Sequence, residues 1–379
     1  MRIGVVAGEA SGDALGVTLM EAVRKRYPEA VFEGIAGPRM QALGAHSLFP
    51  MEMLSVRGYL EVLRALPGLL SIRRQLIRYF LASPPDLFVG IDAPDFNLTL
   101  EKRLKRAGIP TLQMVAPTVW AWRANRLPAI REAVSGVLSV FPFERPIFER
   151  AGIPITDIGH PLAQQIPERT DRAAARLSLA LGSASPVVAL LPGSRVSELE
   201  FHAQLFVDTA ALLQRRFPQA RFLVPLVNRQ TRDQFEKVLR RKPQHLDVMM
   251  LEGRAQEALS AADVALVASG TATLEAALLK CPMVITYRLS ALTAWLVRQR
   301  ATARFFGLPN IILDEAVVPE VIQEAATPQN LAEHLARLLG DPAAQRAMVQ
   351  SFERLHHLLR TDSHQGILKG IAQALQHAS

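Results

Sequence analysis

Three polar residues follow a short apolar segment in the first third of the chain and could do chemistry there. The segment Leu87–Ile91 is typical of a buried strand, and Asp92, Asp95 and Asn97 come directly after it. Carboxylates at the mouth of a buried strand are costly unless water or a substrate engages them. Either Asp95 or Asn97 is placed to cap the next helix. Asp92 is therefore the preferred candidate for chemistry, although spacing alone does not settle the choice.

Two junctions in the second half of the chain combine glycine with hydroxyl side chains. Residues 190–195 include Ser194 and Arg195, and residues 267–275 include Gly270, Thr271 and Glu275. Each junction links a predicted strand to a predicted helix, where free N–H groups and the helix dipole bind phosphate oxygens. Arg195 could add bidentate contacts to a diphosphate. Glu275 could accept hydrogen bonds from a ribose diol, or simply favour the helix N-terminus. The two junctions predict a nucleotide-diphosphate site.

The first predicted strand, Ile3–Ala7, leads into a loop with glycines at positions 8, 12 and 16. This spacing differs from the dinucleotide-binding pattern, and there is no Walker lysine, so a nicotinamide cofactor is disfavoured. A glycine-flanked loop at a strand end lets a ligand approach the backbone closely. An ordinary turn capped by Ser11 or Asp13 explains the spacing equally well.

Two of the three tryptophans, Trp120 and Trp122, lie in a proline-containing segment that ends at Arg123. Aromatic faces beside an arginine are typical of a surface that binds a sugar or an acyl chain. Packing in the core is an equally good interpretation for at least one of the two rings.

The segment Leu60–Phe80 combines apolar residues with more arginines than glutamates. This composition is compatible with a helix in a membrane interface. The residues predicted to face lipid are Leu60, Val62, Leu63, Leu66, Leu69 and Leu70. Pro67 interrupts the apolar face, so composition alone favours an ordinary amphipathic packing helix.

The overall composition excludes several classes of protein. With 379 residues, 49% of them apolar, the chain is long enough for two globular domains. Cys281 is the single cysteine, and no metal-binding histidine motif occurs, so we expect no disulfide, metal or other cofactor. The net charge of +8 with only 6% aromatic residues favours phosphate ligands or an anionic membrane over nucleic acid. The N-terminal apolar run stops at Glu9, too early for a signal peptide, which predicts a cytosolic protein.

Short apolar runs alternate with helical patterns along most of the chain, which predicts an α/β fold with parallel sheets. The predicted strands are Ile3–Ala7, Val31–Ala36, Leu87–Ile91, Thr111–Val115, Val137–Val140, Ile155–Ile158, Val187–Leu191, Arg221–Pro225, Val248–Leu251, Asp263–Ala268 and Met283–Thr286. The predicted helices of the first half are Ala14–Arg26, Leu60–Phe80, Leu98–Arg106 and Pro146–Ala151. Pro161–Arg172 is predicted to link two α/β units, and the tail from Pro328 onward is predicted to be helical. Ligands of such sheets bind at the carboxyl ends of the strands.

In this order, the segments together resemble the lipid-A-disaccharide synthase family. The matching blocks are VAGEASGD (6–13), GIDAPDFN (90–97), VWAW (119–122), FPFE (141–144), IGH (158–160), LLPGSR (190–195), ASGT (268–271) with Glu275, KCPM (280–283) and LPN (308–310). Each block alone is weak, but the ordered set spans nearly the whole chain. Two departures are visible: Ala116 and Thr118 flank Pro117 where the family usually has serines, and Arg57 replaces an apolar residue.

The resemblance implies a GT-B architecture, in which two Rossmann-like domains face each other across a cleft. It implies an acceptor- and membrane-facing domain over residues 1–165 and a UDP-sugar-binding domain over residues 166–345. Helices over residues 346–379 would pack back on the first domain. The implied enzyme is an inverting glycosyltransferase with UDP-2,3-diacylglucosamine as donor and 2,3-diacylglucosamine 1-phosphate as acceptor. Its products would be a β-1,6 disaccharide and UDP.

The resemblance also suggests roles for single residues. A carboxylate must deprotonate the attacking hydroxyl, and Asp92 is the candidate, ahead of Asp95 and Glu9. Preorganised donors must meet the departing UDP. The residues expected around the two substrates are Arg195, Ser194, Gly270, Thr271, Glu275 and Asn310 on the donor side, with Glu9, Ser11 and Trp120 facing the sugars.

The family further implies peripheral association with the cytosolic face of the inner membrane, because both substrates carry acyl chains. The helical tail could also exchange between subunits of a homodimer. Two alternatives keep the fold: another UDP-sugar enzyme, such as a 2-epimerase or a lipid-linked glycosyltransferase, and a non-catalytic protein that binds UDP-sugars or lipids.

Overall fold

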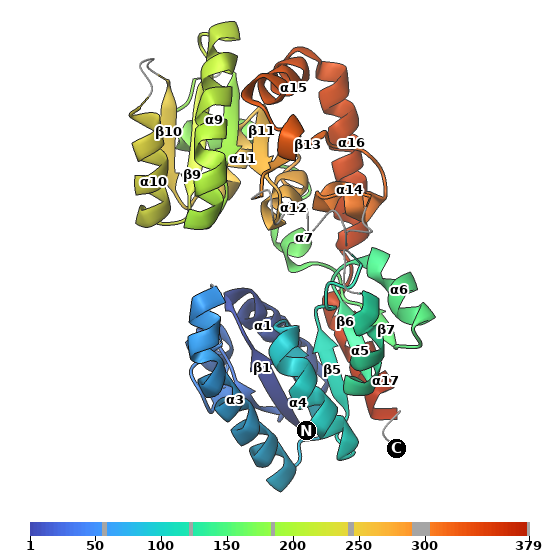
Figure 1. The fold of residues 1–379 in the computed structure, drawn as a ribbon. Coiled ribbons are helices and arrows are strands. Elements are labelled where there is room, and N and C mark those ends of the chain that lie inside the picture. Colours follow the sequence, from blue (N-terminus) through green and yellow to red (C-terminus); the bar gives the residue numbers. More distant parts are fainter. Residues whose placement is uncertain (55–58, 121–123, 183–185, 242–245, 290–303, 377–379) are drawn as a thin grey trace. The chain divides into compact units, whose positions relative to one another are not determined.

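A computed structural model describes the chain except for residues 55–58, 121–123, 183–185, 242–245, 290–303 and 377–379 (Figure 1). The chain divides into two compact units. Unit 1 comprises Met1–Pro161 and Leu359–Ser379, and unit 2 comprises Leu162–Leu358.

Unit 1 contains a seven-stranded parallel sheet with the order β3-β2-β1-β4-β5-β6-β7. Its strands are β1 (Arg2–Ala7), β2 (Val31–Ile35), β3 (His46–Ser47), β4 (Leu87–Ile91), β5 (Thr111–Met114), β6 (Gly136–Ser139) and β7 (Ile155–Asp157). The register aligns Ala7 with Ile91, and Ile91 with Met114, so β1, β4 and β5 end at the same edge. After β1 the chain continues to β2 on one side of β1, and after β4 it continues to β5 on the opposite side. This divergence makes the gap between β1 and β4 a topological switch point, the place where open parallel sheets bind ligands.

Helices cover the sheet of unit 1. They are α1 (Ala10–Arg26), α2 (Pro38–Ala42), α3 (Tyr59–Ala82), α4 (Pro94–Arg106), α5 (Leu127–Ala133), α6 (Arg145–Arg150) and α17 (Ser363–Gln376), with short 3-10 turns at Met51–Met53, Ala124–Arg126 and Pro142–Glu144. α1 packs against α2 and α17, whereas α4 packs against α3 and α5. Right-handed crossovers in opposite directions place these two groups on opposite faces. The central strands are therefore buried on both sides, which explains their continuous apolar runs.

The C-terminal helix α17 belongs to unit 1, which confirms that the helical tail returns to the first domain (Figure 1). Its buried residues Ile367 and Ile371 extend the core of this unit. Gly370 lets the helix approach β6 closely, because a Cβ there would lie 2.3 Å from the Leu138 side chain. The preceding helix α16 (Pro342–Leu359) packs within unit 2, where the Met283 N–H contacts the Met348 sulfur at 3.3 Å. The return to unit 1 therefore begins at Leu359, later than residue 346.

Unit 2 contains a six-stranded parallel sheet with the order β10-β9-β8-β11-β12-β13. Its strands are β8 (Val187–Leu191), β9 (Arg221–Leu226), β10 (Val248–Glu252), β11 (Val264–Ala268), β12 (Met283–Tyr287) and β13 (Glu320–Ile322). Its helices are α7 (Pro161–Gln165), α8 (Arg172–Ser178), α9 (Val196–Arg216), α10 (Arg229–Leu239), α11 (Ala255–Ala261), α12 (Thr271–Leu278), α14 (Leu308–Leu313), α15 (Pro328–Gly340) and α16, with a 3-10 turn at Gln323–Ala325. Here the switch point lies between β8 and β11.

The predicted parallel α/β fold is confirmed, with corrections at its margins. Strands β3 and β13 were not predicted, because β3 consists of two polar residues and β13 begins with a glutamate, so neither is marked by an apolar run. The predicted helix Leu60–Phe80 corresponds to α3, which runs from Tyr59 to Ala82 with Pro67 inside it. The predicted linker contains the short helix α7, and unit 1 ends within it at Pro161.

Candidate active site

A pocket of about 530 Å³ lies at the carboxyl edge of the unit 2 sheet. It lies at the switch point, because the loops after β8 and β11 both line it. Its lining residues are Leu162, Leu191, Gly193, Ser194, Arg195, Glu198, Pro225, Val227, Ala255, Ala268, Ser269, Gly270, Thr271, Ala272, Glu275 and Tyr287. Most of the residues predicted for the donor side thus come together here.

Two glycines let the loops of this pocket start helices α9 and α12. Gly193 has φ +129° and Gly270 has φ +140°, conformations that side chains with a Cβ rarely adopt. A Cβ on Gly193 would also lie 2.7 Å from the Cβ of Glu198, whereas nothing lies within 4 Å at Gly270. At α12 the glycine thus leaves the helix N-terminus open beside the pocket, an arrangement that suits an anion.

Glu198 is a residue of this pocket that the sequence analysis missed. Its Oε2 accepts hydrogen bonds from the backbone N–H groups of Ser194 (2.8 Å) and Arg195 (3.3 Å). Its Oε1 lies 3.4 Å from the Arg195 guanidinium, whose side chain is 65% exposed. A carboxylate thus occupies donors that a phosphate would use. The signal was present, because a glutamate three residues after the helix cap is the spacing of a capping box.

His202 on α9 holds two segments next to this pocket together, and the sequence analysis missed this residue as well. Its Nδ1 lies 3.0 Å from the Pro192 carbonyl oxygen, and its Nε2 accepts from the Arg288 N–H at 3.0 Å. Burial lowers the pKa of His202, so the neutral ring donates through Nδ1 and accepts through Nε2. The imidazole therefore joins the loop after β8 to the end of β12, and its ring packs 5.2 Å from that of Tyr287.

Glu275 lies on α12 with its carboxylate at the pocket. Its Oε1 accepts a hydrogen bond from the Gln256 amide at 2.9 Å. Thr271 is exposed at the start of the same helix, and the Ser269 hydroxyl donates to the Phe306 carbonyl at 3.1 Å. This side of the pocket therefore presents a carboxylate and hydroxyl groups next to the helix N-terminus.

In unit 1, the loops after β1 and β4 meet at the other switch point. Asp92 and Ala93 both have left-handed backbone conformations, with φ +54° and +42°. A Cβ on Gly8 would lie 2.7 Å from the Cβ of Ala93, so only glycine fits where the two loops pass each other. Strained non-glycine residues of this kind gather at functional sites.

The carboxyl of Asp92 is half-buried at this edge. Burial raises its pKa, the Ala93 N–H opposes the rise, and the negative charge of nearby Glu9 adds to it. A carboxylate whose pKa is moved toward neutrality is a stronger base than an exposed one. Glu9 and Asp92 therefore lie close enough to interact electrostatically, and their roles toward the substrates stay predictions.

The expected helix caps were wrong in both loops of unit 1. Helix α4 starts at Pro94 after Ala93, so Asp95 and Asn97 lie inside its first turn. Asp95 pairs with Arg126 at 2.6 Å, and Asn97 is buried. Helix α1 has Glu9 at its N-cap position without a side-chain cap. Ser11 is exposed within α1, and buried Asp13 instead accepts hydrogen bonds from the Arg39 (2.9 Å) and Met40 (3.1 Å) N–H groups.

Trp120 belongs to an aromatic cluster near the ends of β5, β6 and β7. Its ring meets that of Phe143 edge to face at 5.4 Å, and Phe143 stacks on Phe141 at 5.6 Å. The next ring is His160, 5.3 Å from Phe141, and its pKa is lowered to about 4 by burial. The cluster is half-buried, so Trp120 keeps part of its surface available. Trp122 and Arg123 lie outside the described residues.

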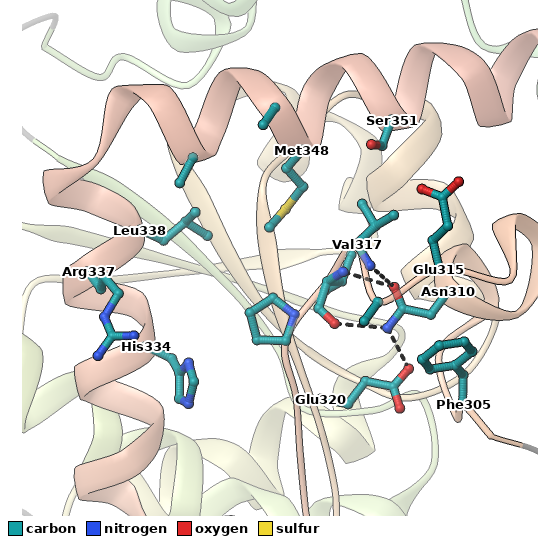
Figure 2. Close-up of a pocket in the computed structure, with 15 residues that line it drawn as sticks. Phe305, Asn310, Glu315, Val317, Glu320, His334, Arg337, Leu338, Met348 and Ser351 are labelled. Carbon is teal, nitrogen blue, oxygen red and sulfur yellow. Dashed lines mark hydrogen bonds between the residues drawn. The ribbon is translucent and has the colours of Figure 1, made fainter.

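Asn310 lies in a different pocket of unit 2, which has a volume of about 670 Å³ (Figure 2). Its Oδ1 accepts from the N–H groups of Val317 (2.9 Å) and Val318 (2.8 Å). Its Nδ2 donates to the Val318 carbonyl and to Glu320 Oε1, both at 2.8 Å. The protein thus uses the full hydrogen-bonding capacity of this amide. Asn310 shapes the segment before β13, and its predicted contact with the donor stays a prediction.

The apolar residues predicted to face lipid lie on α3. Leu66 is 43% exposed, and Leu69 and Leu70 are half-buried. Leu60, Val62 and Leu63 are outside the residues whose side chains the structure describes. Among the helices described, none is long and apolar enough to span a bilayer. The same part of the chain contains no group of three or more acidic, histidine or cysteine side chains placed to hold a metal ion.

The fold is shared with solved sugar-nucleotide enzymes. A UDP-GlcNAc 2-epimerase from Neisseria meningitidis bound to UDP-GlcNAc has a TM-score of 0.60 at 13% identity, over 94% of this chain and 98% of that one. A structure from E. coli described as trehalose-6-phosphate bound with UDP-2-fluoro glucose also has a TM-score of 0.60 at 13% identity, over 99% of each chain. Identity this low shows a common fold, the GT-B arrangement of two parallel α/β sheets.

Sequence relatives are far closer. The family model for lipid-A-disaccharide synthetase matches residues 3–371. A lipid-A-disaccharide synthase from Chromobacterium violaceum is 52% identical over 364 residues, which cover 96% of this chain and 94% of the relative. Another from Thiobacillus denitrificans is 50% identical over 376 residues, 99% of this chain and all (100%) of the relative. The chain therefore belongs to the lipid-A-disaccharide synthase family, the glycosyltransferases of lipid A biosynthesis.

Proposed function

We propose that this chain transfers 2,3-diacylglucosamine from its UDP donor to the 6-hydroxyl of 2,3-diacylglucosamine 1-phosphate. The transfer inverts the anomeric carbon, forms a β-1,6 tetraacyl disaccharide 1-phosphate and releases UDP. The observation that supports this most is the unit 2 pocket, where two helix N-termini and Arg195 meet beside the carboxylate of Glu275.

The unit 2 pocket supports binding of the UDP portion. The N–H groups of Gly270 and Thr271 would bind the diphosphate, with Arg195 as a mobile counter-charge. Glu198 holds the Arg195 guanidinium through a contact of 3.4 Å, and because that side chain is 65% exposed the contact is weak and easily exchanged for a diphosphate. As the glycosidic bond to UDP breaks, these donors stabilise the negative charge that develops on the leaving phosphate. Glu275 would accept hydrogen bonds from the ribose.

The edge of the unit 1 sheet supports a base for the acceptor. A primary hydroxyl is a poor nucleophile, so Asp92 would remove its proton as the oxygen attacks the anomeric carbon. A single displacement from the face opposite UDP inverts that carbon. The raised pKa of Asp92, caused mainly by burial, makes proton transfer to its carboxylate more favourable.

The acylated substrates support peripheral attachment to the inner membrane through α3. Leu66, Leu69 and Leu70 would enter the interface, and the arginines that follow them on the helix would meet anionic lipid headgroups.

The test is to incubate the purified protein with both acylated sugars and to weigh the product by mass spectrometry. Asp92→Asn should lower kcat by about 10²- to 10⁴-fold, the usual contribution of a general base. UDP binding to the unit 2 pocket should be unchanged. Asp95→Asn is the matched control, because Asp95 is exposed and paired with Arg126. If Asp92→Asn keeps normal turnover, Asp92 is not the base, and if the unaltered protein yields no disaccharide, the proposed transfer is wrong.

A further inference from the structure

Three fully buried polar side chains lie beneath the Asp92 loop. Asn97 and Glu101 lie one turn apart on α4, and Gln113 lies on β5. Each has an exposed fraction of 0%. Buried polar groups cost free energy unless they are hydrogen-bonded, so their partners indicate what they do.

The Gln113 side chain contacts backbone carbonyl groups at the ends of β4 and β5. Its Nε2 lies 3.0 Å from the Asp92 carbonyl oxygen, 3.2 Å from that of Met114 and 3.3 Å from that of Val115. Asp92 and Val115 both have positive φ angles, +54° and +71°. This conformation is unusual for any residue with a Cβ and most costly for a β-branched one. The two N–H groups of one buried amide are thus shared among the three carbonyls that this backbone turns inward.

Asn97 holds the same carbonyl from the other side. Its Nδ2 donates to the Asp92 carbonyl at 2.9 Å and lies 3.4 Å from the Val6 carbonyl at the end of β1. The Asp92 N–H donates to the Met114 carbonyl at 2.9 Å. The backbone of Asp92 is therefore fixed at both its N–H and its C=O, which sets the direction in which its side chain leaves the loop.

Glu101 completes the cluster beside Asn97. A Cβ on Gly90 would lie 2.3 Å from Glu101 Oε1 and 3.0 Å from Asn97 Cγ, so these two side chains are neighbours against the same glycine. Within the described part of the chain, Asn97 Oδ1, Gln113 Oε1 and both carboxyl oxygens of Glu101 have no hydrogen-bond partner.

The cluster has more acceptor oxygens than N–H groups to donate to them. The N–H groups of both amides are directed at backbone carbonyls, so each amide oxygen faces the other way and needs a donor. A protonated Glu101 is the one member of the cluster with a hydrogen left to give. Burial raises the pKa of the Glu101 carboxyl well above its usual value, and the Gly90 backbone opposes only part of the rise. This shift favours the protonated carboxyl, which carries the hydrogen that an amide oxygen needs.

We propose that Gln113, Asn97 and Glu101 are positioning residues for Asp92. The Glu101 O–H donates to the Asn97 amide oxygen and so keeps the Asn97 N–H on the Asp92 carbonyl, which Gln113 holds from the other side. The proposal rests on the proposed role of Asp92 as base. An ionised or apolar residue at position 101 would release Asn97 from its orientation, and the Asp92 carboxyl would lose its fixed direction.

The test compares Glu101→Leu, Glu101→Gln and Gln113→Leu in the full-length protein. Leucine removes the donor at position 101, whereas glutamine keeps the shape and supplies an N–H. Thr111→Val is the matched control, because Thr111 lies on the same strand, is equally buried, and donates to the Ala133 carbonyl at 2.9 Å, away from the loop. The measurements are kcat, KM, the pH profile of kcat/KM, the dissociation constant of UDP and the thermal midpoint.

Glu101→Leu and Gln113→Leu should lower kcat by about 10- to 100-fold, the effect of a reacting group displaced by about 1 Å. The dissociation constant of UDP should stay unchanged, because UDP binds unit 2. The acid limb of the pH profile should move to lower pH, because a released Asp92 is better solvated. Glu101→Gln should restore kcat to within about threefold of the parent, a rescue that follows if a donor is what Asn97 needs.

Failure of this proposal can be separated from failure of the proposed base. If the leucine variants turn over as fast as Thr111→Val while Asp92→Asn is inactive, Asp92 is the base and needs no such support. If Glu101→Gln is as impaired as Glu101→Leu, the donor role of Glu101 is wrong. If Asp92→Asn is itself active, the base assignment fails first. A buried leucine in place of a carboxyl need not lower stability. Leucine variants with a reduced kcat and an unchanged thermal midpoint would therefore show that these residues position Asp92.

Discussion

Glu144 should make the stability of unit 1 fall as the pH rises through neutrality. This glutamate is 2% exposed beneath the aromatic cluster of Trp120. Burial raises its pKa from 4.5 to about 8, the negative charge of Asp157 adds to the rise, and hydrogen bonds from Ser139, Trp120 and the Phe141 N–H oppose it. The geometry agrees with a protonated carboxyl. The Ser139 hydroxyl lies 2.5 Å from Glu144 Oε2 and 2.9 Å from the Phe141 carbonyl, but has one hydrogen for both.

The magnitude follows from linkage between protonation and folding. The folded-state pKa is raised, so between 4.5 and about 8 the folded chain holds a proton at Glu144 that the unfolded chain has lost. The stabilising contribution is complete below the unfolded pKa and is lost as the pH rises through the folded one. Each pH unit in this window costs about 1.4 kcal/mol, so going from about pH 5.5 to about pH 7.5 costs about 3 kcal/mol. Glutamine at this position does not titrate and removes the slope.

The assay is urea unfolding of the unaltered protein and of Glu144→Gln at several pH values, with Trp fluorescence as the readout. The quantity compared is the difference in the free energy of unfolding between the two proteins. Buried histidines with lowered pKa values, His160 and His202, also change the stability as the pH falls below about 6.5, but equally in both proteins. Glu149→Gln, at an exposed glutamate on α6, is the control for the loss of one carboxyl group from unit 1. Parallel stability curves for the parent and Glu144→Gln would refute the reasoning.

Three further predictions concern the unit 2 pocket and the α3 surface. Glu198→Gln should tighten UDP binding about fivefold at low ionic strength, measured by calorimetry. The carboxylate charge no longer competes with the diphosphate for the Ser194 and Arg195 N–H groups, and this competition costs about 1 kcal/mol of binding free energy. Weaker binding would contradict this. Gly193→Ala should weaken UDP binding at least about tenfold, because an alanine there has a φ of +129° and a Cβ 2.7 Å from Glu198. The control is Gly68→Ala, whose added Cβ has no neighbour within 4 Å, and this variant should bind UDP normally. Replacing Leu66, Leu69 and Leu70 together by serine should reduce co-sedimentation with anionic vesicles about tenfold or more. Leu177→Ser, at an 81% exposed leucine of unit 2, should leave it unchanged. Equal sedimentation of the two proteins would exclude this surface.

Much of the fold could be predicted because its signals are local. Each central strand is buried on both faces, so its residues form an apolar run such as Leu87–Ile91, whose bounds agree with β4. The junctions after β8 and β11 were predicted for the same reason, because a glycine and hydroxyl residues between strand and helix are visible in sequence. The two short edge strands were missed, since pairing with a neighbour, and not composition, makes them strands.

The sequence by itself determined the order of strands and helices, the residues at each strand end and the family to which the chain belongs. Only the tertiary structure decided which of these ends are neighbours, because strand order depends on contacts between residues far apart in the chain. It joined the Gly8 loop to the Asp92 loop, brought Glu198 onto the Ser194 and Arg195 N–H groups, and placed Asn310 in a separate pocket. It also raised the pKa values of the Glu101 and Glu144 carboxyls, because burial removes the water that would solvate their charge.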